Sequence, residues 1–298
     1  MKKPARRKPG ELLPKPFLKW AGGKGQLVDD LLRLAPGDFS AYHEPMLGGA
    51  ALFFALQRNG RLAGKRVFLS DINEELVGTY RAIQQDVTKV IARLEEHQRK
   101  FRALGTEGRR RYYYSQRAQD PASLDPPTMA ARMIFLNRTG FNGLYRVNSK
   151  GKFNVPIGRY RNPLICNEEN LQAVAGALAG VEIASASFQS VLERARPGDF
   201  VYFDPPYFPL STTAKFVSYA RSGFGPKDQE ELAATMSALR DRGVRVMLSN
   251  SDTREVRLMY QDEFRIHEVM ACRHINSKAD QRGPVSELVV TSYEPGQG

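Results

Sequence analysis

The stretch Val201-Tyr202-Phe203-Asp204-Pro205-Pro206-Tyr207 decides the fold class of this chain. Its first residues are apolar, as in a buried strand, and two consecutive prolines cannot continue a sheet ladder. The strand over residues 200–203 must therefore end before Asp204. In open α/β sheets, ligands bind at the carboxyl ends of the strands. The stretch thus predicts a buried strand that opens directly into a candidate active site.

The four residues after this strand bring together three chemical features. Asp204 supplies a carboxylate, Pro205 a carbonyl followed by a residue without an N–H, and Tyr207 an aromatic face. Two such acceptors can hold both protons of the exocyclic amino group of a nucleobase, while the tyrosine ring stacks on that base. The set therefore suits an amino group that attacks an electrophile. An ordinary strand-ending turn is the alternative, and two prolines alone would not exceed it.

Strands and helices alternate on both sides of this stretch. Apolar runs predict further strands at residues 66–69, 181–187 and 244–248. Amphipathic spacing predicts helices at residues 25–34, 51–58 and 228–240. Residues 264–270 and 287–292 are expected to pair as antiparallel strands at the sheet edge. This alternation predicts an α/β fold with a doubly wound, mostly parallel sheet.

The middle of the chain interrupts that pattern. Residues 74–104 and 128–138 are expected to be helical, residues 105–127 to be a polar connector, and residues 139–163 to be a basic loop. We therefore expect three parts: a discontinuous sheet domain over residues 11–73 and 167–298, an inserted domain over residues 74–166, and a basic tail over residues 1–10.

Charge indicates a polyanionic partner. The chain has 44 Lys and Arg against 32 Asp and Glu, a net charge of +12. Residues 132–161 carry no acidic residue, and aromatic residues lie between their basic ones. This combination suits a surface that neutralises phosphates and touches bases. A merely basic protein is the alternative.

Composition argues against several other classes. The longest apolar runs, residues 50–56 and 173–181, are too short to cross a bilayer, and no apolar segment follows the basic N-terminus. We therefore expect neither a membrane anchor nor a signal peptide. Two cysteines predict free thiols in a reducing cytoplasm. The four histidines are scattered, so no metal site is expected.

Two glycine-containing segments are candidates for ligand binding. Phe17-Leu18-Lys19-Trp20-Ala21-Gly22-Gly23-Lys24 lacks the spacer of a P-loop, and Gly25 stands where Ser or Thr would hold magnesium. It indicates a loop that wraps a small polar ligand beside an aromatic ring, with a flexible turn as the alternative. Residues 44–50 resemble a glycine turn after a first strand. Asp71, at the end of the next strand, is placed to bind the ribose of an adenosine-containing cofactor.

Taken in order, these segments resemble the Dam-type (D12 class) family of DNA N6-adenine methyltransferases over residues 17–295. Residues 136–146 and 151–158 are similar to the DNA-recognition hairpin of that family. Residues 249–253, Arg282 and Glu287-Leu288 fit its C-terminal part. The chain departs from the family at Gly48-Gly49-Ala50, where Gly-x-Gly is more usual, and at Phe141, where relatives often carry Tyr.

The resemblance implies an enzyme that transfers a methyl group from S-adenosylmethionine to a flipped-out adenine in double-stranded DNA. It also implies a Rossmann-like methyltransferase sheet with an inserted, mostly helical DNA-recognition domain that carries a β-hairpin. The implied catalytic residues are Asp204, Pro205, Pro206 and Tyr207. The implied cofactor-binding residues are Trp20, Ala21, Gly22, Lys24, Glu44, Pro45, Gly48, Asp71, Ile72, Ser187, Phe188 and Asp204. The implied DNA-binding residues are Lys19, Arg138, Phe141, Asn142, Leu144, Arg146, Asn148 and Pro156.

The resemblance extends to the target sequence. Leu144, Arg146 and Pro156 coincide in type and spacing with the positions that read GATC in the family, and Lys19 matches the residue at the first guanine. The expected setting is a prokaryotic cytoplasm or a phage-infected cell, with or without a separate restriction endonuclease. Other methyltransferases are disfavoured, because N4-cytosine enzymes usually carry Ser, and RNA or protein-glutamine enzymes more often Asn, at position 204. A nucleotide-dependent oxidoreductase would need a dinucleotide glycine pattern, which is absent from this sequence. A catalytically inactive DNA-binding module would need a broken signature, and the signature at residues 204–207 is intact.

Overall fold

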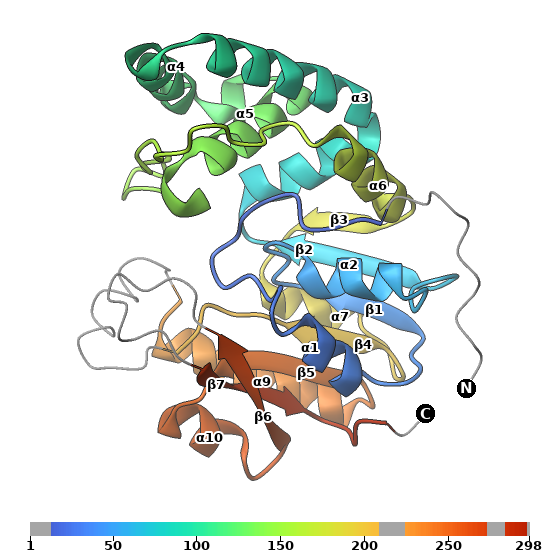
Figure 1. Cartoon of the computed structure of the whole chain (residues 1–298). Coiled ribbons are helices and arrows are strands. Elements are labelled where there is room, and N and C mark those ends of the chain that lie inside the picture. Colours follow the sequence, from blue (N-terminus) through green and yellow to red (C-terminus); the bar gives the residue numbers. More distant parts are fainter. Residues whose placement is uncertain (1–12, 209–223, 273–283, 297–298) are drawn as a thin grey trace. The chain divides into compact units, whose positions relative to one another are not determined.

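The computed structural model describes residues 13–208, 224–272 and 284–296, so the basic tail and Arg282 lie outside the described residues (Figure 1). The chain divides into two compact units. We call residues 1–23, 48–61 and 73–185 the helical unit, and residues 24–47, 62–72 and 186–298 the sheet unit. The functional domain limits expected from the sequence stay a prediction.

The sheet unit is built on a mostly parallel sheet. Its strands are β1 (Ala41–Glu44), β2 (Arg66–Asp71), β4 (Phe200–Phe203), β5 (Arg245–Ser251), β6 (Arg265–Cys272) and β7 (Pro284–Thr291). They lie in the order β2-β1-β4-β5-β7-β6. The pairs within β2-β1-β4-β5 are parallel, whereas β7 pairs antiparallel with both β5 and β6. The α/β class and the antiparallel edge pair are therefore confirmed.

The order of the strands creates a switch point. β1 and β4 are neighbours, with Tyr42 opposite Phe200, although they are far apart in the sequence. On either side of this pair the chain winds outward in opposite directions, to β2 and to β5. In doubly wound sheets, ligands bind at the carboxyl ends of the strands beside such a point. Glu44 and Asp204 are the residues at those two strand ends.

Helices of the sheet unit bury its apolar side chains. They are α1 (Val28–Leu34), η3 (Phe188–Ser190), α7 (Val191–Arg194), α9 (Pro226–Asp241) and α10 (Arg254–Tyr260). The α9 helix places Leu232, Met236 and Leu239 on one face, where they pack into the same core as Phe203 and Leu248. Burying each such side chain contributes roughly 1.5–3 kcal/mol. This packing fixes β4 and β5, and with them the residues that follow β4.

The helical unit surrounds a long helix. Its elements are α2 (Ala51–Arg58), α3 (Glu74–Ala103), α4 (Thr106–Ala118), η1 (Pro121–Ser123), α5 (Pro126–Thr139), η2 (Phe141–Gly143), α6 (Glu168–Leu178) and β3 (Glu182–Ser185). The Asn73 side chain caps α3 by accepting from the Leu76 N–H, and Asp125 caps α5 in the same way through Thr128. No helix within the described residues is long and apolar enough to span a membrane.

One sequence prediction was wrong and several element bounds differ. Residues 105–127 do not form a connector throughout, because α4 occupies residues 106–118. Tyr113 is the one fully buried side chain of α4, so the helix has no apolar period to detect, and long-range bonds hold it instead. The helix expected at residues 25–34 begins only at Val28, and β3 is shorter than the expected strand at residues 181–187. β5 continues three residues beyond the expected end, to Ser251.

Candidate active site and recognition surface

Asp204 follows β4 directly, as predicted, and is ion-paired. The Lys24 ammonium lies 2.6 Å from Asp204 Oδ1, and the Lys24 side chain is only 4% exposed. Burial raises the pKa of Asp204, the Lys24 charge opposes that rise, and the nearby charge of Glu287 adds to it. Lys24 is therefore the group that favours the carboxylate form of Asp204, which is the form that accepts hydrogen bonds.

Tyr207 is held at its face and at its hydroxyl. The Lys24 ammonium lies 4.4 Å from the ring centroid, a cation–π contact. The hydroxyl donates to Glu287 Oε2 at 2.5 Å. Burial and the charges of Asp204 and Glu287 raise the pKa of Tyr207 far above its usual range, so the phenol stays a neutral donor. Lys24, Asp204, Tyr207 and Glu287 thus form one connected group, here called the active-site quartet.

Buried side chains hold the backbone after the two prolines. Asn250 Oδ1 accepts from the Phe208 N–H at 3.0 Å, and Ser251 Oγ donates to the Phe208 carbonyl at 2.6 Å. Gln229 Nε2 donates to the Pro206 carbonyl at 3.0 Å, and Asn250 Nδ2 donates to Gln229 Oε1 at 3.2 Å. In the part of the chain that the structure describes, no donor lies on the Pro205 carbonyl, which fits its expected role as an acceptor.

We call these bonds from Gln229, Asn250 and Ser251 the clamp, and the sequence predicts it only in part. The sequence assigns residues 249–253 to the family by resemblance but gives them no role, and it gives no reason to select Gln229. The available signal was a run of polar residues at the end of an apolar strand, where side chains that are buried must find partners. Asn250 and Ser251 are indeed buried.

The predicted cofactor residues of the sheet unit lie at the carboxyl ends of its parallel strands. Glu44 ends β1, is buried, and accepts from the Tyr42 hydroxyl at 2.7 Å, and buried Pro45 follows it. Asp71 ends β2 and is half-buried, while the next side chain, Ile72, is 79% exposed. A carboxylate beside an exposed apolar side chain is an arrangement that a ribose and a flat base could use.

Two backbone bonds bring neighbouring loops to the end of β2. The Ala186 N–H donates to the Asp71 carbonyl at 3.1 Å, and the Leu47 N–H donates to the Ser70 carbonyl at 2.9 Å. The first bond places exposed Ser187 and buried Phe188 just beyond this strand end. The structure therefore gathers six sheet-unit members of the predicted cofactor set around the ends of β1 and β2, namely Glu44, Pro45, Asp71, Ile72, Ser187 and Phe188. The other two, Lys24 and Asp204, lie at the end of β4.

The other predicted cofactor residues belong to the helical unit. The Trp20 ring stacks on the Tyr145 ring, with centroids 5.4 Å apart. Gly48 has a φ of +46°, and a Cβ built on it would lie 2.9 Å from Trp20 Cδ1. Only glycine lets the backbone lie so close to the indole in this conformation. Ala21 and Gly22, which follow Trp20, are exposed.

The expected DNA-recognition hairpin is an irregular antiparallel loop in the helical unit. Isolated bridges join Gly140 to Ile157 and Val147 to Phe153. Asn148 closes the turn, because its Oδ1 accepts from the Lys150 and Lys152 N–H groups at 3.0 Å. We call residues 140–157 the recognition hairpin.

Most of the predicted base-reading side chains are accessible. Arg146 and Pro156 are exposed, Leu144 is half-exposed, and Arg146 Nε donates to Asn154 Oδ1 at 2.6 Å within the hairpin itself. Phe141 is 48% exposed, and the exposed Asn142 beside it has a φ of +53°. Exposed Lys19 donates from Nζ to the Tyr160 hydroxyl at 3.3 Å.

Arg138 differs from the other predicted DNA-binding residues. It is half-buried and donates to the Phe17 carbonyl at 2.7 Å. Burial lowers the pKa of its guanidinium. In this structure the side chain therefore ties the segment before Lys19 to the end of α5.

Two groups, buried Asn137 and half-buried Tyr145, anchor the recognition hairpin to the rest of its unit. Asn137 donates from Nδ2 to the carbonyls of Lys19 and Gly143, both at 2.7 Å, and accepts from the Lys19 N–H at 2.8 Å. Tyr145 donates to Glu75 Oε2 at 2.9 Å, and the other oxygen of Glu75 pairs with Arg132 at 2.7 Å. Arg132 begins the basic stretch noted in the sequence, but it is buried and structural.

Comparisons with known proteins agree with this geometry. Residues 20–275 match the family of D12 class N6 adenine-specific DNA methyltransferases. The chain is 39% identical to a type II methyltransferase of Lactococcus lactis subsp. cremoris, covering 94% of this chain and 95% of that protein. It is 35% identical to a DNA adenine methylase of Escherichia coli, covering 94% of this chain and 95% of that protein.

The chain belongs to the D12 class of DNA adenine methyltransferases. A second type II methyltransferase, from Methanocaldococcus jannaschii, is 41% identical over 94% of this chain and 99% of that protein. The family resemblance drawn from the sequence is therefore confirmed, and so is the enzyme class.

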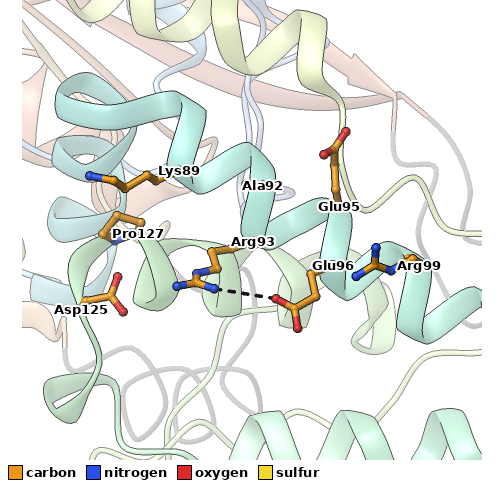
Figure 2. A pocket seen from close by; sticks show the side chains of 8 residues that line it. All are labelled: Lys89, Ala92, Arg93, Glu95, Glu96, Arg99, Asp125 and Pro127. Atoms are coloured by element: carbon orange, nitrogen blue, oxygen red, sulfur yellow. Dashed lines mark ion pairs between the residues drawn. The ribbon is translucent and has the colours of Figure 1, made fainter.

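A pocket on the helical unit of the methyltransferase carries none of the predicted site residues. Figure 2 shows it between α3 and α5, lined by Lys89, Ala92, Arg93, Glu95, Glu96, Arg99, Asp125 and Pro127. Its basic and acidic side chains balance, and Arg93 lies 3.9 Å from Glu96. A pocket without surplus positive charge has no electrostatic preference for a polyanion.

The three consecutive arginines of α4, Arg109–Arg111, differ in burial and in contacts. Arg109 is half-buried and donates to the carbonyls of Phe101, Arg102 and Arg161, so it holds α4 in place. Arg110 and Arg111 are exposed. Of the three arginines, these two are the ones whose charges are accessible to a polyanion such as DNA.

Proposed function

We propose that this enzyme transfers the methyl group of S-adenosylmethionine to N6 of an adenine flipped out of duplex DNA, within 5′-GATC. The active-site quartet and the Pro205 carbonyl support the reaction. They put a carboxylate, a carbonyl and an aromatic ring within one turn at the switch point of the sheet. Family membership supports the choice of adenine and of DNA.

The residues present fit an adenosine-containing methyl donor. Asp71 offers a carboxylate for ribose hydroxyls, and the exposed Ile72 side chain offers an apolar face for the adenine. Glu44, Pro45, Ser187 and Phe188 would line the same strand ends, with Lys24 beside Asp204. Trp20, Ala21, Gly22 and Gly48, which belong to the helical unit, are proposed as cofactor residues on the family resemblance alone. When bound, S-adenosylmethionine supplies an electrophilic methyl group on a sulfonium.

The protein's part in the reaction is to position the attacking amino group. Asp204 would accept one N6 proton in a hydrogen bond and the Pro205 carbonyl the other, which draws the nitrogen lone pair out of conjugation with the base. Positive charge develops on N6 during the attack, and the Asp204 carboxylate stabilises it from a fixed position. Tyr207 would stack on the base. Pro206 gives the turn its shape and, through its carbonyl, its link to Gln229.

A paired adenine cannot reach such a site, so the base must leave the helix at a cost of a few kcal/mol. Phe141, whose side chain is 48% exposed, would fill the gap or stack on the orphaned partner, with Asn142 beside it. Asn148, which closes the hairpin turn, would contact the duplex nearby. Arg138 would act indirectly, by positioning the Lys19 segment through its bond to the Phe17 carbonyl.

Specificity for GATC rests on the recognition hairpin. Arg146 would grip guanine O6 and N7 with two donors, and Leu144 and Pro156 would contact a thymine methyl group. Arg146 and Pro156 are exposed and Leu144 is partly exposed, so all three are available to a duplex. Lys19 would contact the first guanine after leaving Tyr160.

Mass spectrometry tests the reaction. The purified enzyme is incubated with unmethylated duplex DNA and S-adenosylmethionine labelled in its methyl group, and the DNA is then digested to nucleosides. We expect the label in N6-methyldeoxyadenosine alone. Label in N4-methylcytosine, or in no nucleoside, would contradict the proposal.

A further inference from the structure

The fold fixes Glu287 relative to the residues after β4. Glu287 lies on β7 opposite Ser251 of β5, and Ser251 Oγ donates to the Phe208 carbonyl. The same strand pair therefore holds the backbone next to Tyr207 and carries the acceptor of the Tyr207 hydroxyl. A shift of the Tyr207 ring would break a bond to a rigid element.

The bond between Tyr207 and Glu287 is of a strong type. A neutral hydroxyl that donates to a carboxylate forms a charge-assisted hydrogen bond, which is roughly twice as strong as a neutral one. Rotation of a tyrosine ring about its last torsion is otherwise broad. The hydroxyl oxygen lies on the axis of that torsion, but the phenolic O–H bond prefers to lie in the plane of the ring. Donating that hydrogen to Glu287 Oε2, with the Lys24 ammonium packed on the ring face, therefore restricts the ring plane.

We propose that Glu287 is a positioning residue for methyl transfer, because it fixes the plane of the Tyr207 ring on which the target adenine stacks. This inference rests on the proposed function, in which Tyr207 receives the flipped base. Stacking stabilises the base only while the ring stays parallel to it. A ring free to swing would capture the base in orientations that place N6 away from Asp204 and Pro205.

The role predicts a pattern among variants. Glu287→Ala removes the acceptor, and Tyr207→Phe removes the donor but keeps the ring. Each is expected to lower kcat/KM about tenfold, the low end of the range for a hydrogen bond to a charged group. The double variant is expected to lose about tenfold as well, because both changes break the same bond. Glu287→Gln keeps an acceptor oxygen and should stay within about threefold of wild type.

A fluorescence titration supplies a readout that a merely structural role would not move. The probe is a GATC duplex with 2-aminopurine in place of the target adenine, titrated with each variant in the presence of S-adenosylhomocysteine. We expect wild-type enzyme to raise the emission on flipping. Glu287→Ala and Tyr207→Phe should raise it further, because a misaligned ring quenches the base less. Asp262→Ala, which removes an exposed carboxylate of the same unit, is the matched control and should match wild type.

Each outcome decides between the claims. No rise with wild-type enzyme, and none with either Glu287→Ala or Tyr207→Phe, would overturn the proposed base flipping, and the positioning role with it. A normal rise with wild type, together with a Glu287→Ala variant indistinguishable from Asp262→Ala, would overturn the positioning role alone. A double variant about a hundredfold below wild type would show that Glu287 and Tyr207 act independently, which also overturns it. If Glu287→Ala melts below the assay temperature, Tyr207→Phe and Glu287→Gln carry the same comparison.

Discussion

The loop after β4, which carries Asp204 and Tyr207, and the recognition hairpin are both held by a buried asparagine, but they differ in which of their side chains stay exposed. Asn250 holds the backbone after Pro206, and the functional side chains there are themselves paired, Asp204 with Lys24 and Tyr207 with Glu287. Asn137 holds the backbone of the hairpin, yet Arg146 and Pro156 remain exposed. Chemistry requires groups fixed before the substrate arrives, whereas reading a duplex requires side chains that are free to meet it.

The largest expected effect comes from replacing Asp204, the central residue of the loop after β4. Asp204→Ala removes an acceptor used in the transition state and no phosphate contact. We expect kcat to fall by about 10²–10³ or more, with the DNA dissociation constant almost unchanged. Single-turnover methylation and a binding titration measure the two. A variant within tenfold of wild-type turnover would contradict the assignment of Asp204.

Asn250 and Asn137 allow a direct comparison of the two loops. Asn250→Ala and Asn137→Ala each leave buried backbone groups without a partner, and each should destabilise the fold by about 1–3 kcal/mol. Asn250→Ala should lower kcat on every DNA, whereas Asn137→Ala should mainly reduce the preference for GATC. Steady-state kinetics on cognate and altered duplexes, with thermal melting of both variants, checks this. Equal losses of kcat and of preference in both variants would count against the division.

Arg146→Ala removes the guanine contact that we propose for the recognition hairpin. Loss of a bidentate contact to guanine should cost about 1–3 kcal/mol of discrimination at one base pair, and less on sites that already lack it. The ratio of kcat/KM for GATC to kcat/KM for each singly altered site measures the change. A uniform loss on all sites would assign Arg146 to phosphate contact instead.

The pH dependence of kcat tests whether Lys24 sets the ionisation of Asp204. Because the charge of Lys24 lowers the pKa of Asp204 against burial, Lys24→Met should raise that pKa. Activity requires the carboxylate, so the acid limb of log kcat should move to higher pH. The profile is measured with the methyl donor saturating, because Lys24 is also a proposed cofactor residue. An unmoved acid limb would show that another group sets it.

The smallest expected effect concerns charge away from the base readers. Replacing Arg110 and Arg111 by Ala should flatten the slope of log K against log salt by about one to two, if both reach phosphates. Arg109 is left in place because it holds α4. Fluorescence anisotropy on a nonspecific duplex at several salt concentrations gives the slope. An identical slope would place both side chains on a solvated face.

The two regions also differ in how far the sequence predicts them. The end of β4 and the position of Asp204 follow from an apolar run stopped by two prolines, which are local signals. The clamp by Gln229 could not be predicted, because its partner is a backbone carbonyl distant in the sequence. The same holds for Glu75, which meets both Arg132 and Tyr145. Such long-range polar contacts depend on the packed fold and leave no periodic pattern.

The recognition hairpin illustrates a further limit. The basic and aromatic composition of residues 132–161 was visible, but not which cations are exposed. Arg132 is buried and Arg138 half-buried, whereas Arg146 is exposed. The difference depends on whether a side chain lies on an inward or outward face of α5 and the hairpin, and those faces are set by Tyr145 and Asn137.

The most direct test of the account is methylation of plasmid DNA in vitro, followed by digestion with an endonuclease that adenine methylation in GATC blocks. We expect full protection by the wild-type enzyme with S-adenosylmethionine, and no protection by Asp204→Ala under the same conditions. Complete cutting of the plasmid by the endonuclease, alongside methyl incorporation elsewhere in the DNA, would contradict the proposed specificity.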